Sequence, residues 1–126
     1  MPAVDTNVLV RLLTADDPDQ TARAEALVAR GPVWVSTVVL VEAVWVLSAV
    51  YGWRKAHLLA MLRTLTDSRD FTVQEPSVVA AAIASYRDCT ADFAACLARE
   101  LARAADQLPF ATFDTQAAKL PGAVEP

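Results

Sequence analysis

The stretch "PAVDTNVLVRLL" (residues 2–13) changes its character at Asp5. Before Asp5 the chain is short and apolar, as a buried strand is, and after it apolar residues recur at helical spacing. The "DTN" triplet supplies side chains that cap a helix N-terminus. The stretch therefore predicts a short strand, an acidic side chain at its carboxyl end, and a helix over residues 6–13.

The same alternation of strand and helix continues along the chain. Strand-like segments lie at 33–36, 71–74 and 109–113, and helical patterns lie at 16–30, 37–52, 54–65, 76–87, 92–105 and 115–122. Strands whose connections are too long for hairpins pair in parallel, and a parallel sheet is covered by helices on both faces. We therefore predict the α/β fold class.

Length and composition indicate one domain that spans residues 1–126. The chain has 55% hydrophobic and 21% charged residues, enough apolar surface for a core. No apolar run approaches the roughly 18 residues of a membrane helix, and the N-terminus lacks a secretory signal, so we expect no membrane contact and a cytoplasmic location. Cys89 and Cys96 lack a neighbouring Cys or His pair, which predicts reduced, structural thiols.

The net charge of −4 argues against a broad basic surface that grips nucleic acid. Carboxylates that hold a divalent cation would reverse the local field where a phosphate binds. Asp5 and Asp114 each follow a predicted strand, and ligands of parallel sheets bind outside the carboxyl ends of the strands. Each of these two acids is explained equally simply as a helix cap.

Glu42 is the single charged residue between Val33 and Trp53, on a helix that is apolar nearly all round. A buried carboxylate without partners is strongly disfavoured, so we expect Glu42 to face a cavity, a metal or a basic partner. Arg30 and Arg54 are the nearest basic residues, and a structural ion pair stays open as an alternative.

Asp92 begins the helix predicted at 92–105, where capping is the simplest interpretation. Asp92, Cys96, Arg99 and Arg103 follow at steps of four, three and four and share one helical stripe. Such a face suits a metal site that leads into a phosphate path, although a solvated surface gives the same pattern.

Four acids on four elements suit Mg²⁺ or Mn²⁺, which prefer oxygen ligands, and the matching chemistry is metal-assisted hydrolysis of phosphodiesters. His57, the only histidine, lies beside Arg54 and Lys55 and is expected on the surface. With three glycines in the chain, no glycine-rich phosphate loop competes with this interpretation.

The order of these acids resembles the PIN-domain ribonucleases, and among them the VapC-type toxins of toxin–antitoxin modules. The matching segments are "VDTNVLVRLL" (4–13), "VSTVVLVEAVWVL" (35–47), "ADFAACLARELA" (91–102) and "FATFDTQAAKLPG" (110–122). The resemblance implies a PIN-like α/β/α sandwich with a central parallel sheet of four to five strands. It also implies Mg²⁺- or Mn²⁺-dependent cleavage of RNA, a homodimer, and a cognate antitoxin protein.

The resemblance assigns roles to individual residues of this chain. Asp5, Asp92 and Asp114 would be metal ligands, and Glu42 a ligand through water or the group that orients the attacking water. Hydrogen bonds that hold the carboxylates would come from Asn7, Ser36 and Thr112. Arg99 would steady a flanking phosphate, with Arg11 as the weaker candidate; ordinary surface salt bridges explain these arginines equally well.

One position departs from the family pattern. The helix of the family commonly carries a second aspartate where this chain has Ala95. Three explanations stay open: Asp92 performs the duty, the chain has lost cleavage and persists as a binding partner, or an original aspartate was changed to alanine. Two other functions also stay open, a non-catalytic protein-interaction domain and a DNA-directed nuclease. Trp34, Trp45 and Trp53 would suit a buried dimer or partner surface, although core packing explains most of them.

Overall fold

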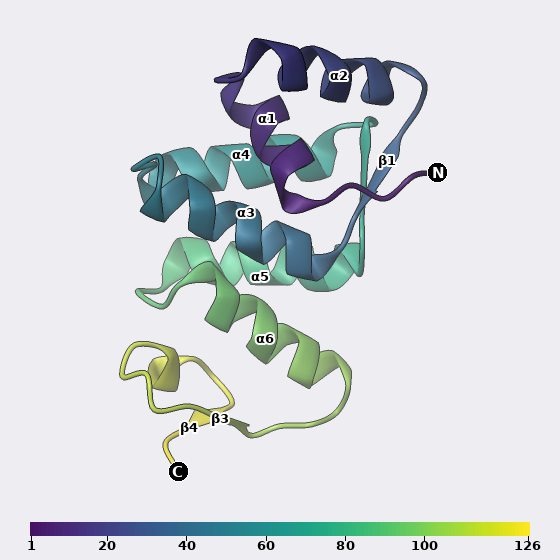
Figure 1. The fold of residues 1–126 in the computed structure, drawn as a ribbon. Coiled ribbons are helices and arrows are strands. Elements are labelled where there is room, and N and C mark those ends of the chain that lie inside the picture. The colour runs from purple at the N-terminus through teal and green to yellow at the C-terminus, as the bar shows by residue number, and fades with distance from the viewer. The chain divides into compact units, whose positions relative to one another are not determined.

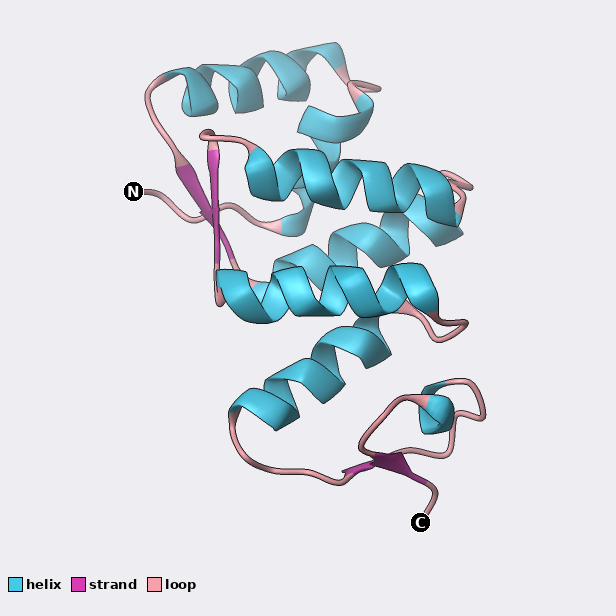
Figure 2. Cartoon of the chain, turned by 180° about the vertical axis from the view of Figure 1, so that it is seen from behind, coloured by secondary structure: helices cyan, strands magenta, loops and turns pink.

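The computed structural model describes residues 1–126 and divides the chain into two units, Met1–Gln74 and Glu75–Pro126. The first unit contains four helices and a parallel strand pair (Figures 1 and 2). Its elements are α1 (Thr6–Thr14), α2 (Pro18–Ala29), β1 (Val33–Val35), α3 (Thr37–Ala49), α4 (Lys55–Asp67) and β2 (Phe71–Val73). These agree with the predicted segments to within a few residues at each end.

The strands of the first unit lie side by side in parallel. β1 pairs with β2 in the register Val33 to Phe71, and Ala3 forms an isolated parallel bridge with Trp34. The Val4 N–H donates to the Trp34 carbonyl over 3.0 Å, and the Trp34 N–H donates to the Pro2 carbonyl over 2.8 Å. The segment before Asp5 is therefore extended beside β1, as predicted, and delivers Asp5 to the start of α1.

Helix α3 buries one face and exposes the other. Its buried residues are Leu40, Ala43, Val44 and Leu47. On the opposite face Val38 and Trp45 are 64% and 65% exposed, so Trp45 is not one of the tryptophans that pack in the core. An apolar pattern all round a helix gave no indication of which face would stay outside.

The second unit contains α5 (Pro76–Asp88), α6 (Phe93–Ala104), β3 (Phe110–Ala111), the 3₁₀ turn η1 (Ala117–Lys119) and β4 (Ala123–Val124). α5 and α6 pack as a helical hairpin, with the Tyr86 and Phe93 rings edge to face at 5.8 Å. β3 pairs with β4 in parallel. The pattern predicted β3 but missed β4, a two-residue strand too short to show any periodicity.

The α/β class is confirmed, because every strand pair is parallel and helices connect the strands. The strands are two or three residues long and form two separate two-stranded sheets, in place of the expected sheet of four to five strands. None of the helices is long and apolar enough to cross a membrane. The extent of the domain, 1–126, stays a prediction.

Candidate functional site

Asp5 caps the N-terminus of α1. Its backbone is extended, with φ −91° and ψ 178°, and its Oδ1 accepts a hydrogen bond from the Val8 N–H over 3.1 Å. The capping interpretation is therefore confirmed. The capping bond uses one carboxylate oxygen of an exposed side chain, so it leaves Oδ2 available for a cation or a water molecule.

Glu42 lies beside the same helix terminus. The Thr6 hydroxyl donates a hydrogen bond to Glu42 Oε2 over 3.2 Å, which brings the middle of α3 to the first residue of α1. Because Thr6 directly follows Asp5, the Asp5 and Glu42 side chains belong to one neighbourhood. No cation of this unit pairs with Glu42, so the ion-pair alternative finds no support here.

The Glu42 side chain is exposed on the open face of α3, so solvent, and not a buried basic partner, surrounds its carboxylate. The sequence shows a carboxylate on an almost wholly apolar helix, and this composition does not tell which stripe of the helix is buried. In the structure one stripe of α3 supplies the core, and Glu42 belongs to the other stripe. Its carboxylate is therefore accessible to substrate and to solvent cations.

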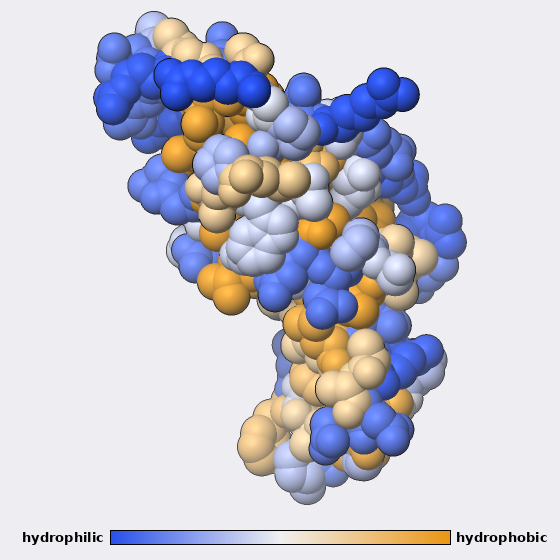
Figure 3. Space-filling view, turned by 90° about the vertical axis from the view of Figure 1, so that its right-hand side faces the viewer, coloured by the Kyte–Doolittle hydropathy of each residue, from blue (hydrophilic) through white to orange (hydrophobic).

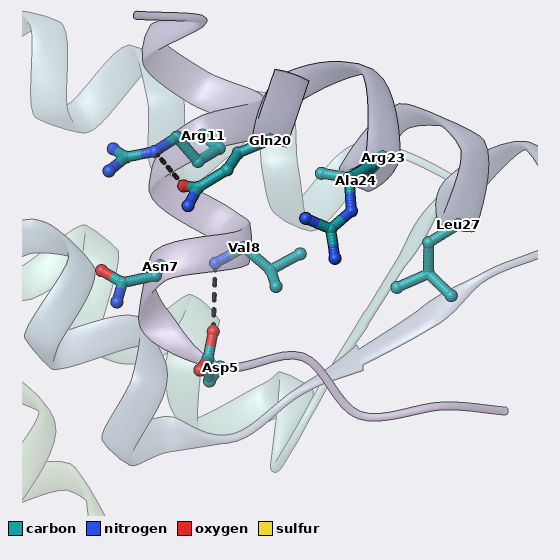
Figure 4. Close-up of a pocket in the computed structure, with 8 residues that line it drawn as sticks. All are labelled: Asp5, Asn7, Val8, Arg11, Gln20, Arg23, Ala24 and Leu27. Atoms are coloured by element: carbon teal, nitrogen blue, oxygen red, sulfur yellow. Dashed lines mark hydrogen bonds between the residues drawn. The ribbon is translucent and has the colours of Figure 1, made fainter. Parts of the chain in front are cut away.

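A pocket opens between α1 and α2 next to Asp5 (Figure 4). We call it the α1–α2 pocket, and its volume is about 290 Å³. It is lined by Asp5, Asn7, Val8, Arg11, Gln20, Arg23, Ala24 and Leu27. The pocket thus combines one acid of the site, two arginines, two amides and three apolar side chains.

Arg11 is held in this pocket by partners on three sides. Its Nε donates to Gln20 Oε1 over 2.7 Å, and its Nη1 lies 3.2 Å from Asp16 Oδ1 and 3.3 Å from the Tyr51 hydroxyl. Tyr51 in turn donates to Asp16 Oδ2 over 2.6 Å, and this hydrogen bond is the main reason that the pKa of Asp16 lies below its usual value. The sequence gave no signal for this network, because Tyr51 lies 35 residues from Asp16.

Asp92 and Asp114 are caps as well. Asp92 Oδ1 accepts from the Ala95 N–H over 2.8 Å at the start of α6. Asp114 Oδ1 accepts from the N–H groups of Gln116 and Ala117 over 2.9 and 2.8 Å, at the turn that begins η1. Both side chains are exposed, and each uses Oδ1 for these bonds, as Asp5 does.

The supporting hydrogen bonds differ from those expected. Ser36 caps α3 by accepting from the Val39 N–H over 3.1 Å, and the Thr112 hydroxyl accepts from the backbone N–H of Asp114 over 3.1 Å. Neither holds a carboxylate. Asn7 lines the α1–α2 pocket, and it is Thr6 that holds an acid. Thr6 was missed because its place after Asp5 suggested capping alone.

Arg99 has a structural role in place of the expected phosphate contact. It is 2% exposed, and its guanidinium donates to the Pro121 carbonyl and the Ser85 hydroxyl, each over 2.9 Å. Its Nη2 also lies 2.9 Å from Glu100 Oε1. These bonds tie α6 to α5 and to the C-terminal segment, and they leave the guanidinium poorly placed to meet a substrate.

Two cysteines and the only histidine lie outside the candidate site. Cys89 and Cys96 are thiols with Sγ atoms 3.5 Å apart, and burial is the main cause that raises the pKa of Cys96 to about 12. His57 is exposed and stacks on Trp53 with ring centroids 3.6 Å apart. Neither group is part of the candidate site.

The donor set fits a hard divalent cation in one respect. Mg²⁺ is usually bound by one or two carboxylates with water completing its octahedron, and Asp5 and Glu42 provide two exposed carboxylates in one neighbourhood. Neither unit gathers three or more His, Cys, Asp or Glu side chains that share one position for a metal. The arrangement therefore suits a hydrated cation better than a closed cage of protein ligands.

Comparison with known proteins gives one match that covers nearly the whole chain. The family model described as PIN domain matches residues 3–123 and so spans both units. No curated protein and no solved structure matches the chain.

Proposed function

The chain belongs to the PIN domain family, and from this premise we propose that it is a metal-dependent endoribonuclease, the toxin component of a VapBC-type toxin–antitoxin system. PIN domains are generally metal-dependent nucleases, which supports hydrolysis of phosphodiesters. The observation that carries the proposal is the hydrogen bond from Thr6 to Glu42, because it gathers two exposed acids at the start of α1.

We assign Mg²⁺ or Mn²⁺ to the carboxylates. Asp5 would bind the cation through the oxygen that does not cap α1, and Glu42 would contact it through water or orient the attacking water. When bound, the cation lowers the pKa of a water molecule and offsets the negative charge that grows on the phosphate. The bare carboxylates would otherwise repel the substrate backbone.

The residues of the chain orient the reactants. Thr6 fixes Oε2 of Glu42, so Oε1 would accept a hydrogen bond from the attacking water and take its proton, while the P–O bond to the 3′ oxygen breaks and that oxygen leaves with the help of the metal or solvent. Asp92 and Asp114 of the second unit are each proposed as a metal ligand because acids at these positions follow the family pattern, and each has one carboxylate oxygen that its capping bonds do not use. Asp92 would then take the duty of the second family aspartate, whose position is Ala95.

The proposed partners are an RNA substrate, a cognate antitoxin and a second copy of the chain. The exposed Val38 and Trp45 on α3 support a protein partner, because large apolar side chains on a surface are typical of interaction sites. The proposed location is cytoplasmic, where an RNA-cleaving toxin meets its substrate.

The decisive experiment combines metal binding and cleavage. We expect saturable binding of Mn²⁺ by calorimetry, loss of that binding in Asp5→Asn, and cleavage of structured RNA that stops when EDTA removes the cation. Absence of Mn²⁺ binding, even in Ala95→Asp, would favour the non-catalytic interaction domain. Cleavage of single-stranded DNA in preference to RNA would favour the DNA-directed nuclease.

A further inference from the structure

The α1–α2 pocket has the size and chemistry of a site for one nucleotide. Its volume of about 290 Å³ lies just below the range of roughly 300–1,000 Å³ that is usual for small-molecule sites, which suits a small occupant. Val8, Ala24 and Leu27 line it with apolar surface, on which a base or ribose can pack. Asp5 lies at the end of α1 that borders the same pocket (Figure 4).

Arg23 is the cation of this pocket that is available to a ligand. In Figure 4 its side chain extends from α2 into the space that Val8 and Asp5 border from the other side. Its one ion pair, with Asp19, spans 3.6 Å between side chains that are 77% and 80% exposed. Such a pair contributes little because water screens it, so Arg23 can exchange Asp19 for a phosphate at small cost.

Arg11 and Gln20 shape another part of the pocket, and neighbouring side chains hold Arg11 there. The Nε of Arg11 is bound to Gln20 and its Nη1 to Asp16. Because Gln20 accepts this bond through Oε1, its amide NH₂ group can still donate to an acceptor on a base edge. The wall of the pocket thus offers a hydrogen-bond donor, an apolar face and a phosphate-binding guanidinium.

Because the pocket lies beside Asp5, its position indicates which nucleotide of an RNA strand it would hold. The whole chain is acidic, and hydrophilic residues gather over the α2 end of the first unit (Figure 3). An RNA strand whose scissile phosphate is placed at Asp5 carries a further phosphate one nucleotide away, and this phosphate needs a cation other than the metal. Arg23 provides that cation beside Asp5.

We propose that the α1–α2 pocket binds the nucleotide next to the cleaved phosphodiester, with Arg23 paired to its phosphate and Leu27 packed against its base or ribose. The proposal rests on the proposed nuclease function for its substrate, but the pocket and its arginine are independent of the metal. A binding experiment without metal therefore tests it separately.

The experiment titrates the full chain with AMP, CMP, GMP, UMP and inorganic phosphate in EDTA, followed by ¹H–¹⁵N NMR. We expect saturable shifts of the backbone amides around Val8 and Ala24 with at least one nucleotide. Loss of a charge-assisted hydrogen bond in Arg23→Gln should weaken binding about tenfold. The matched control is Arg63→Gln, an exposed arginine of α4 outside the pocket, which should leave binding unchanged.

A second variant separates the nucleoside from its phosphate. Leu27→Ala should weaken nucleotide binding but leave any phosphate binding unchanged. Equal affinity for phosphate and for all four nucleotides would overturn the proposal, as would shifts that Arg23→Gln and Arg63→Gln alter alike. An absence of shifts with every probe would also overturn it.

Cleavage assays separate the two proposals. Mg²⁺-dependent cleavage of RNA without nucleotide binding in the pocket would leave the nuclease function standing and remove the pocket site. Nucleotide binding that Arg23→Gln weakens, in a chain that never cleaves RNA, would support the pocket and contradict the nuclease. If both hold, Arg23→Gln should raise KM and leave kcat nearly unchanged, because it removes a contact made equally before and during the reaction.

Discussion

The hydroxyl of Thr6 donates a hydrogen bond of 3.2 Å to Oε2 of Glu42, across 36 positions of the sequence. This bond joins the first residue of α1 to the middle of α3, and it brings the Glu42 carboxylate next to the terminus that Asp5 caps. The pairing gives Glu42 a defined orientation although its side chain is exposed. Its loss should therefore affect chemistry more than stability.

Replacing Thr6 by valine tests this relationship. Thr6→Val keeps the shape of the side chain but removes the donor, so RNA cleavage should fall about tenfold, as is typical when a group that orients a metal ligand is lost. Thr6→Ser keeps the hydroxyl and should retain most activity. The measurement is the initial rate of Mg²⁺-dependent cleavage for the three proteins. Equal rates for Thr6→Val and wild type would contradict an orienting role.

Two substitutions at Asp5 separate its capping role from its proposed ligand role. Asp5→Asn keeps an oxygen acceptor for the Val8 N–H, so the free energy of unfolding should change little while Mn²⁺ binding is lost. Asp5→Ala should lose both the helix cap and Mn²⁺ binding, and the free energy of unfolding should decrease by about 1 kcal/mol. Urea denaturation and calorimetric titration measure the two effects. Mn²⁺ affinity preserved in Asp5→Asn would show that this carboxylate does not bind the cation.

Restoring an acid at position 95 tests the departure from the family pattern. Ala95 lies in the first turn of α6, where a negative charge interacts favourably with the helix dipole, so Ala95→Asp should not destabilise the fold. We expect stronger Mg²⁺ dependence and faster cleavage of structured RNA than in the chain as it stands. Ala95→Asn is the matched control without charge. Unchanged cleavage in Ala95→Asp would mean that this position does not matter.

The hydrogen bond from Tyr51 lowers the pKa of Asp16, and Tyr51→Phe should raise that pKa toward the ordinary value of an aspartate. A group whose folded pKa is depressed contributes stability above its unfolded pKa and loses that contribution as pH falls through the folded pKa. The stability difference between wild type and Tyr51→Phe should therefore be constant above about pH 5 and shrink below about pH 4. Carbon-detected NMR titration of the Asp16 carboxyl reports the pKa directly. An identical titration in both proteins would contradict the coupling.

Burial keeps the Cys96 thiol protonated at neutral pH, since its pKa is raised to about 12. At about pH 8 the thiolate fraction is then about 10⁻⁴, so iodoacetamide should modify Cys96 only very slowly in the folded protein. The experiment uses Cys89→Ser, which leaves Cys96 as the single cysteine, and follows alkylation by mass spectrometry. Urea should make the reaction fast. Rapid alkylation without denaturant would show that Cys96 is accessible and ionised.

Local sequence was sufficient for most of the secondary structure and for the caps. Thr6–Thr14, Pro18–Ala29 and the other helices follow from apolar spacing and from Pro or Gly at their ends, which act within a few residues. Asp5, Asp92 and Asp114 were expected as possible caps, and each accepts the predicted kind of backbone N–H. These features depend on neighbours in the chain, so the sequence carries them directly.

The packing of the helices and strands decided which side chains face outward and which distant residues meet. Apolar residues surround α3, and the choice of the stripe that carries Leu40 and Leu47 as its buried face left Glu42 exposed. Thr6 reaches Glu42, and Arg99 reaches Ser85 and Pro121, only after helices have docked. Local pattern cannot encode such pairs, because the free energy of a contact between distant residues depends on how every intervening element packs.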